Sequence, residues 1–203
     1  MIDESTLAAA EQFARDAFAG DASGHDWHHT LRVRRLAETI AVDEGADLRV
    51  VALAALLHDV DDAKVSPATS ERLDNARAFL AEQGVGERDA EQVLDAIREV
   101  SFSKNGGACP SSLEAACVRD ADRLDAIGAI GVARAFAYGG STGRAMHDPT
   151  GDDRTTTIQH FHDKLLLLRD LMCTDAGRRI AEARHEVTQA FLDEFLLEWD
   201  GAR

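Results

Sequence analysis

The chain has 203 residues, a length that suits one domain with a single core better than two. Its 37 acidic and 22 basic residues give a net charge of −15, which argues against non-specific binding to nucleic acid or to an anionic membrane. The longest apolar run, residues 50–57, is too short to span a bilayer, and no secretory signal is recognisable. Three cysteines, an odd number without metal-ligand spacing, predict reduced thiols and a cytoplasmic protein.

The hydrophobic pattern predicts helices throughout, because apolar residues recur every three or four positions and no period-2 alternation is sustained. The first clear helix is expected over about 26–44, with Asp26 near its N-terminus, where a carboxylate favours the helix dipole. Residues 50–57 are apolar on every side and are expected to form the buried central helix. Ser66-Pro67 is typical of a helix start, and Gly84 of the end of that helix.

The same pattern continues to the C-terminus. Helices are expected over about 89–101 and 115–126, the second preceded by a capping box of Ser111 and Glu114. A glycine-rich stretch over 138–153 indicates a longer loop. Apolar stripes at 158–172 and 191–199 predict the last helices. The predicted fold class is therefore all-α.

Histidines and aspartates at three places suggest a metal site. His29 lies on the apolar stripe of its helix and points inward, where a buried imidazole needs a partner for each nitrogen. His58-Asp59 ends the most buried helix, and Asp122 and Asp125 share one face of a later helix. Taken singly, each of these residues is more often structural. Together, two histidines with carboxylates form a mixed nitrogen and oxygen set that suits a divalent cation.

Four sequence blocks resemble the HD-domain superfamily of metal-dependent phosphohydrolases, and most closely its small stand-alone bacterial and archaeal members. The blocks are HDWHHTLRV (25–33), ALLHDVDDAK (55–64), RDADRLDAIGAIGVAR (119–134) and HFHDKLLLLRDLMCT (160–174). They occur in the family's order and cover most of the chain. The resemblance implies a single helical HD-domain bundle over 1–203, with a metal core over about 25–135 and C-terminal helices over 156–200 packing on it.

By motif position, the resemblance implies one divalent ion held by four residues. They are His29, His58, Asp59 and Asp122. Asp122 is preferred to its neighbour Asp125 because it aligns with the aspartate of the family's ADRL-type segment. The sequence leaves the metal open among Mn²⁺, Mg²⁺, Co²⁺, Ni²⁺, Fe²⁺ and Zn²⁺. No histidine lies between Asp59 and Asp122, which resembles the mononuclear branch of the superfamily.

The resemblance implies hydrolysis of phosphate ester or phosphoanhydride bonds by a metal-activated water. Asp62 occupies the place where related nucleotide hydrolases carry a catalytic acid, and Asp61 is its neighbour. An anionic substrate approaching an acidic protein requires local cations or other donors at the site. The candidate substrate contacts are Arg32, Lys64, His160 and Lys164.

The expected partner is a phosphorylated small molecule, with a nucleotide as the first choice, and a homodimer is a candidate assembly. One alternative is a (p)ppGpp hydrolase, although that branch has a longer acidic signature than HDVDDAK after its His-Asp pair. Another is a non-catalytic, metal-stabilised module that senses a nucleotide without hydrolysing it.

Overall fold

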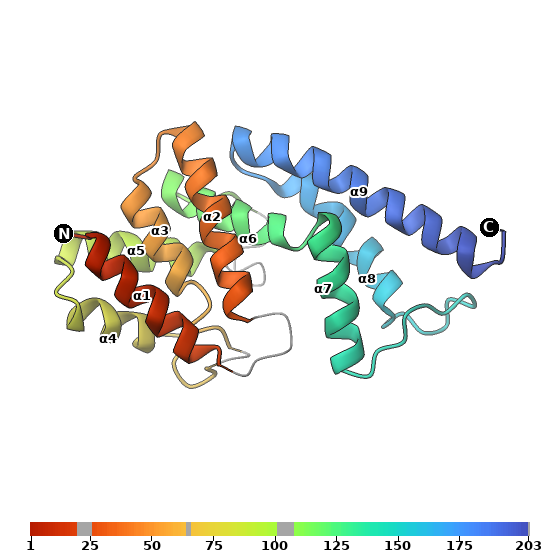
Figure 1. Ribbon diagram of the computed structural model, residues 1–203, viewed down its shortest axis with the longest axis horizontal. Coiled ribbons are helices and arrows are strands. Elements are labelled where there is room, and N and C mark those ends of the chain that lie inside the picture. The colour runs from red at the N-terminus through yellow and green to blue at the C-terminus, as the bar shows by residue number, and fades with distance from the viewer. Residues whose placement is uncertain (20–25, 64–65, 101–107, 203) are drawn as a thin grey trace.

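The computed structural model describes residues 1–19, 26–63, 66–100 and 108–202, and these parts of the chain contain nine α-helices, one 3-10 helix and no strand (Figure 1). The all-α prediction is confirmed. The elements are α1 (Glu4–Ala17), α2 (Trp27–Glu44), α3 (Leu48–Leu57), α4 (Asp74–Glu82), α5 (Glu87–Val100), α6 (Leu113–Asp125), α7 (Gly128–Ser141), α8 (Thr157–Asp163), η1 (Leu165–Leu171) and α9 (Asp175–Trp199).

Helix α3 forms the centre of the N-terminal half. Residues 50–57 are all buried, as their unbroken apolar run predicts. Around α3 lie α1, α2, α5 and α6, and α2 also packs closely against α6 (Figure 1). This arrangement brings the N-terminal turn of α2, the C-terminal end of α3 and the length of α6 together, which are the three places where the sequence predicts metal ligands.

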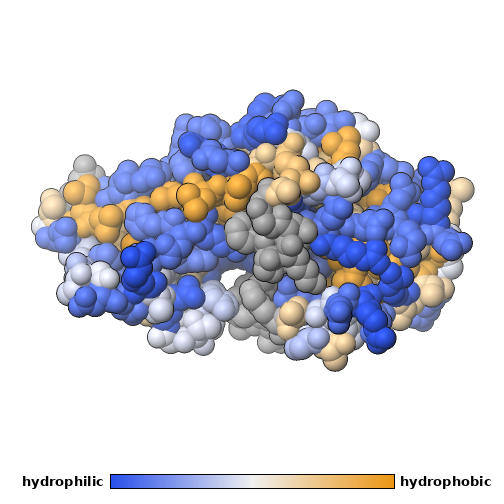
Figure 2. All heavy atoms as spheres, turned by 180° about the vertical axis from the view of Figure 1, so that it is seen from behind, coloured by the Kyte–Doolittle hydropathy of each residue, from blue (hydrophilic) through white to orange (hydrophobic). Residues whose placement is uncertain are grey.

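The C-terminal half consists of α7, α8, η1 and the long helix α9. Helix α9 packs against α7 and η1, and it reaches α6 and α2 in the other half (Figure 1). Seen from behind, the surface is mostly hydrophilic, with an apolar band on the C-terminal half (Figure 2). Within the described ranges, no helix combines the length and the apolar character that crossing a membrane requires.

Two helix starts differ from the prediction. Residues 66–73 form turns, and the helix expected from Ser66-Pro67 begins only at Asp74; Gly84, at φ +63°, does lie just beyond its end. The cap of α6 is Ser112, whose hydroxyl accepts the N–H of Ala115, one residue later than the predicted capping box. At the start of α4 the carboxylate of Asp61 accepts two backbone N–H groups, while at α6 the predicted cap Ser111 hydrogen-bonds to Glu99 instead.

Two C-terminal segments also differ. The apolar stripe over 158–172 is divided between α8 and η1, because Lys164 has the non-helical angles φ −141° and ψ −59°. The predicted loop over 138–153 begins only after Ser141, since α7 continues through Gly139 and Gly140. The periodicity identified the buried side chains correctly, but it did not locate the break in the backbone.

The prediction of three reduced cysteines is wrong. Cys109 and Cys173, 64 residues apart in sequence, form a disulfide, and Cys117 is a buried free thiol. The pairing depends on tertiary structure, because the segment around Cys173 is held on α6 by the buried carboxylate of Asp120. Since disulfides are typical of oxidising compartments, the cysteine content no longer supports the cytoplasmic prediction.

Gly177, in the first turn of α9, has no room for a side chain. A Cβ there would lie 2.4 Å from Oδ2 of Asp120 and 2.6 Å from Oγ1 of Thr174. We therefore expect Gly177→Ala to lower the free energy of unfolding by about 1–3 kcal/mol in chemical denaturation. Gly140→Ala is the matched control, because a Cβ at this helical glycine meets nothing within 4 Å. Equal stability of the two variants would contradict the prediction.

Candidate metal centre

His29 is directed into the protein by the start of α2. Asp26 is the N-cap residue, and its Oδ1 accepts the backbone N–H of His29 at 2.8 Å. His29 then lies on the same face of α2 as the buried residues Val33 and Ile40, and it is itself 1% exposed. The apolar stripe identified from the sequence therefore places the imidazole of His29 in the interior of the protein.

His58 and Asp59 follow the last residue of α3. The Nδ1–H of His58 donates to the carbonyl oxygen of Ala55 at 2.8 Å, because a carbonyl can only accept. This hydrogen bond leaves the buried Nε2 of His58 facing the carboxylate of Asp59, where it finds no hydrogen-bond partner in the described part of the chain. A buried nitrogen without a hydrogen-bond partner raises the free energy of the folded protein unless a ligand such as a cation binds it.

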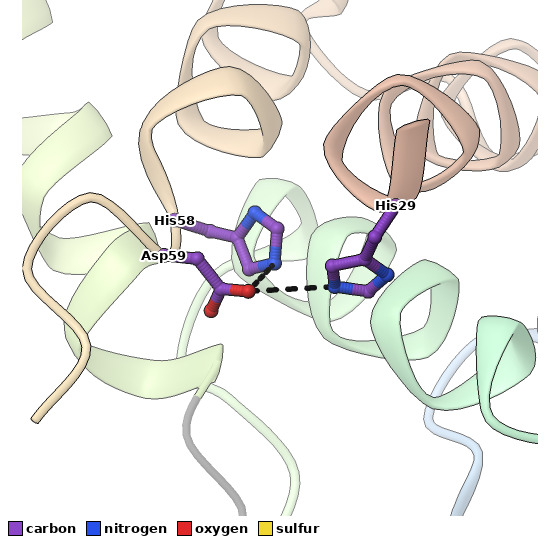
Figure 3. Close-up of side chains that lie close together, drawn as sticks. All are labelled: His29, His58 and Asp59. Atoms are coloured by element: carbon purple, nitrogen blue, oxygen red, sulfur yellow. Dashed lines mark ion pairs between the residues drawn. The ribbon is translucent and has the colours of Figure 1, made fainter. Parts of the chain in front are cut away.

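Four side chains from α2, α6 and the end of α3 meet at this point, three of which are drawn in Figure 3. Oδ2 of Asp59 lies 3.4 Å from Nε2 of His29 and 3.2 Å from Nε2 of His58 (Figure 3). Oδ1 of Asp122 lies 3.4 Å and 4.0 Å from the same two nitrogens. The structure thus brings together His29, His58, Asp59 and Asp122.

The spacing of these atoms fits a divalent cation. With metal–ligand bonds of about 2.1 Å, neighbouring ligands of an octahedral ion lie about 3.0 Å apart and opposite ligands about 4.2 Å apart. The cluster of His29, His58 and Asp59 could hold a metal ion. The side chain of Asp122 is 35% exposed, whereas the two imidazoles are buried, so the cluster opens toward solvent on the Asp122 side.

The two imidazoles lie in a strongly negative environment. Burial alone would lower the pKa of His29, but hydrogen bonds to Asp122, Asp125 and Asp59 outweigh it and raise the pKa to about 10. The pKa of His58 is also raised, because the attraction of Asp59 and Asp122 exceeds the effect of burial. The carboxylates therefore stabilise positive charge at this point, whether it is carried by protons or by a cation.

The sequence analysis weighed Asp125 as a metal ligand and preferred Asp122, and it did not consider Arg134; both residues lie around the cluster. The buried carboxylate of Asp125 accepts Nδ1–H of His29 at 2.7 Å and Nη1–H of Arg134 at 2.8 Å. The same carboxylate binds Nε and Nη2 of Arg32 at 2.7 and 3.0 Å. Arg32 is thus held by Asp125, and its direct contact with a substrate stays a prediction. The spacing of Asp122 and Asp125 was the available signal, since residues three apart share a helix face.

The two catalytic candidates after Asp59 have different surroundings. Asp61 is buried, and its two carboxylate oxygens accept the backbone N–H groups of Asn75 at 3.1 Å and Ala76 at 2.9 Å. This binding to the first turn of α4 gives Asp61 a structural role, and its catalytic role stays a prediction. Asp62 is half-buried, and its N–H donates to the carbonyl of Asp59 at 3.0 Å, so it stays in the same turn as the cluster.

The remaining predicted substrate contacts are Lys64, His160 and Lys164. Lys64 lies outside the described residues. His160 and Lys164 are half-buried at the end of α8, one turn apart, and neither belongs to the group of His29, His58 and Asp59. Their contact with a substrate stays a prediction.

Known proteins share both the sequence and the fold. The model of the HD domain family matches residues 26–127. YpgQ of Bacillus subtilis is 40% identical over 191 residues, which are 92% of this chain and 91% of YpgQ. The crystal structure of YpgQ in complex with ADP has a TM-score of 0.80 at 36% identity, and the match covers 93% of this chain and 95% of that one.

Two further solved structures match nearly the whole chain. A Lactobacillus plantarum protein has a TM-score of 0.85 at 39% identity and covers 99% of this chain and 100% of its own. An HD-superfamily hydrolase from Bacillus thuringiensis has a TM-score of 0.78 at 39% identity and covers 97% and 98%. Together with the family match and the cluster of histidines and aspartates, these similarities show that the chain belongs to the HD-domain family of hydrolases.

Proposed function

We propose that the chain is a divalent-metal-dependent phosphohydrolase that cleaves a phosphate ester or phosphoanhydride bond of a nucleotide. The observation that carries the proposal is the meeting of two imidazoles and two carboxylates from α2, α6 and the end of α3. The buried Nε2 of His58, which lacks a hydrogen-bond partner among the described residues, supports a cation at this point. The complex of the relative YpgQ with ADP supports a nucleotide as the substrate class.

His29 and His58 would hold the ion through Nε2, and Asp59 and Asp122 through one carboxylate oxygen each. With both imidazoles neutral, the two carboxylates offer a charge of −2, which a divalent cation balances. When bound, such an ion polarises a phosphoryl oxygen and lowers the pKa of a water molecule toward neutrality. Asp62, in the turn after Asp59, would accept or relay the proton that the attacking water loses.

The decisive experiment measures release of phosphate and pyrophosphate from a panel of nucleotides. The metal-stripped protein is assayed after addition of Mn²⁺, Mg²⁺, Co²⁺ or Ni²⁺, and again after addition of a chelator. We expect turnover of at least one nucleotide that depends on the added metal. Binding of nucleotides without turnover under every metal would contradict hydrolysis and favour a sensing module.

Metal affinity should rise with pH. Since the pKa of His29 in the metal-free protein is raised to about 10, this imidazole carries a proton at neutral pH that the ion must displace. Displacing one proton strengthens apparent binding about tenfold for each pH unit below that pKa, and any proton on His58 adds to this slope. Titration calorimetry with Mn²⁺ at pH 6, 7 and 8, in buffers of different ionisation enthalpy, measures the apparent affinity and the number of protons released on binding. An affinity independent of pH, with no proton release, would contradict the assignment.

A further inference from the structure

Asp125, on α6, contacts two neighbouring helices around the cluster without facing the cluster itself. Its carboxylate is 1% exposed and accepts hydrogen bonds from His29 and Arg32 on α2 and from Arg134 on α7. Its two oxygens face four N–H groups, namely Nδ1 of His29, Nε and Nη2 of Arg32 and Nη1 of Arg134, so the carboxylate acts as an acceptor.

The two edges of the His29 ring face different carboxylates. Nδ1 lies 2.7 Å from Oδ2 of Asp125, and Nε2 lies 3.4 Å from Oδ1 of Asp122. One turn of α6 thus supplies an acceptor to one edge of the imidazole and a carboxylate to the other. Because Asp125 accepts the proton on Nδ1, the lone pair of the neutral ring is on Nε2, which faces the cluster.

His58 reaches the same tautomer by a different contact. Its Nδ1–H is accepted by the neutral carbonyl of Ala55, whereas that of His29 is accepted by a full negative charge. A charged acceptor makes the opposite nitrogen a better donor to a cation than a neutral acceptor does. Two guanidinium groups pair with the one Asp125 carboxylate, so this buried carboxylate adds no unpaired negative charge to the interior.

We propose that Asp125 is a positioning residue that holds Nε2 of His29 ready to bind a divalent ion, and that Arg32 and Arg134 hold the Asp125 carboxylate in place. This inference rests on the proposed metal site and adds residues to it that do not touch the ion. It also assigns a reason for the pair of aspartates three residues apart on α6, of which Asp122 alone faces the cluster.

A purely structural role is the competing explanation, because Asp125 connects α2, α6 and α7. Asp120→Asn is a matched control for it. Asp120 lies five residues earlier on α6, is 0% exposed, and binds the backbone of Cys173 and Thr174. Substituting either aspartate removes a buried, hydrogen-bonded carboxylate, but only one of the two contacts an imidazole of the cluster.

The test measures the Kd for Mn²⁺ of the metal-stripped, folded proteins by electron paramagnetic resonance. We expect Asp125→Ala to weaken Mn²⁺ binding about 10- to 100-fold, as is typical of residues that orient metal ligands. Asp125→Asn keeps an acceptor oxygen and should fall between Asp125→Ala and the wild type. Asp120→Asn should lower the melting temperature yet bind Mn²⁺ about as tightly as the wild type.

The outcomes separate this inference from the proposed function. Wild-type affinity in Asp125→Ala, or an equal loss in Asp120→Asn, would overturn the positioning role while the metal site stands. If Asp125→Ala does not fold, Asp125→Asn decides, and an unchanged Kd in that variant would overturn the inference. Failure of the wild type itself to bind Mn²⁺ would overturn the metal site and the inference together.

Discussion

His58→Ala is expected to abolish retention of a divalent ion and, with it, hydrolysis. His58 supplies one of only two nitrogen atoms in the cluster, and its Nε2 has no other hydrogen-bond partner in the described parts of the chain. Loss of the several kcal/mol that a bound ion contributes to charge stabilisation corresponds to a fall in turnover of at least about 10³-fold. Metal content after gel filtration, measured by mass spectrometry, and nucleotide turnover check the two parts of the prediction.

His162→Ala is the matched control for this variant. His162 is an exposed histidine on α8, outside the cluster, so its removal should leave metal content and turnover unchanged. The Nδ1–H of His58 donates to the carbonyl of Ala55 in its own helix, so we expect circular dichroism to show an intact helical fold in His58→Ala. Equal metal retention in folded His58→Ala and in the wild type would remove the site as described.

The sequence predicted those parts of the site that follow from the helical periodicity of the segment that carries them. His29 follows the 3.6-residue stripe of α2, and its inward direction needs only the helix and the Asp26 cap. His58 ends a run so apolar that the helix carrying it has to be buried. The family motif added Asp122, which periodicity by itself could not separate from Asp125.

The parts that the sequence did not predict depend on partners that are distant along the chain. Asp125 meets Arg32 across 93 residues, and Cys109 meets Cys173 across 64. The contact of the Asp61 carboxylate with the start of α4, 14 residues later, likewise had no signal in the sequence around Asp61. In each case the side chain offers several chemical roles, and the packing of a remote segment selects one of them.

Asp62→Ala is expected to lower turnover by about 10²- to 10⁴-fold while metal content stays unchanged, if Asp62 accepts or relays the proton of the attacking water. Asp62 is half-buried in the turn that follows Asp59, and it is not one of the three residues His29, His58 and Asp59 that could hold the ion. Steady-state kinetics on the best nucleotide of the panel, together with metal analysis of the same samples, measures both effects.

Asp61→Ala is the contrasting variant. It removes the neighbouring carboxylate, and we expect it to lower the stability of the protein and not its turnover. Loss of the two hydrogen bonds to the start of α4 should cost about 1–2 kcal/mol in unfolding, while turnover per folded molecule is retained. A loss of turnover in Asp61→Ala with none in Asp62→Ala would exchange the two roles. Negligible turnover in the wild type and in both variants would instead favour nucleotide sensing, because a proton acceptor has no effect where no bond is broken.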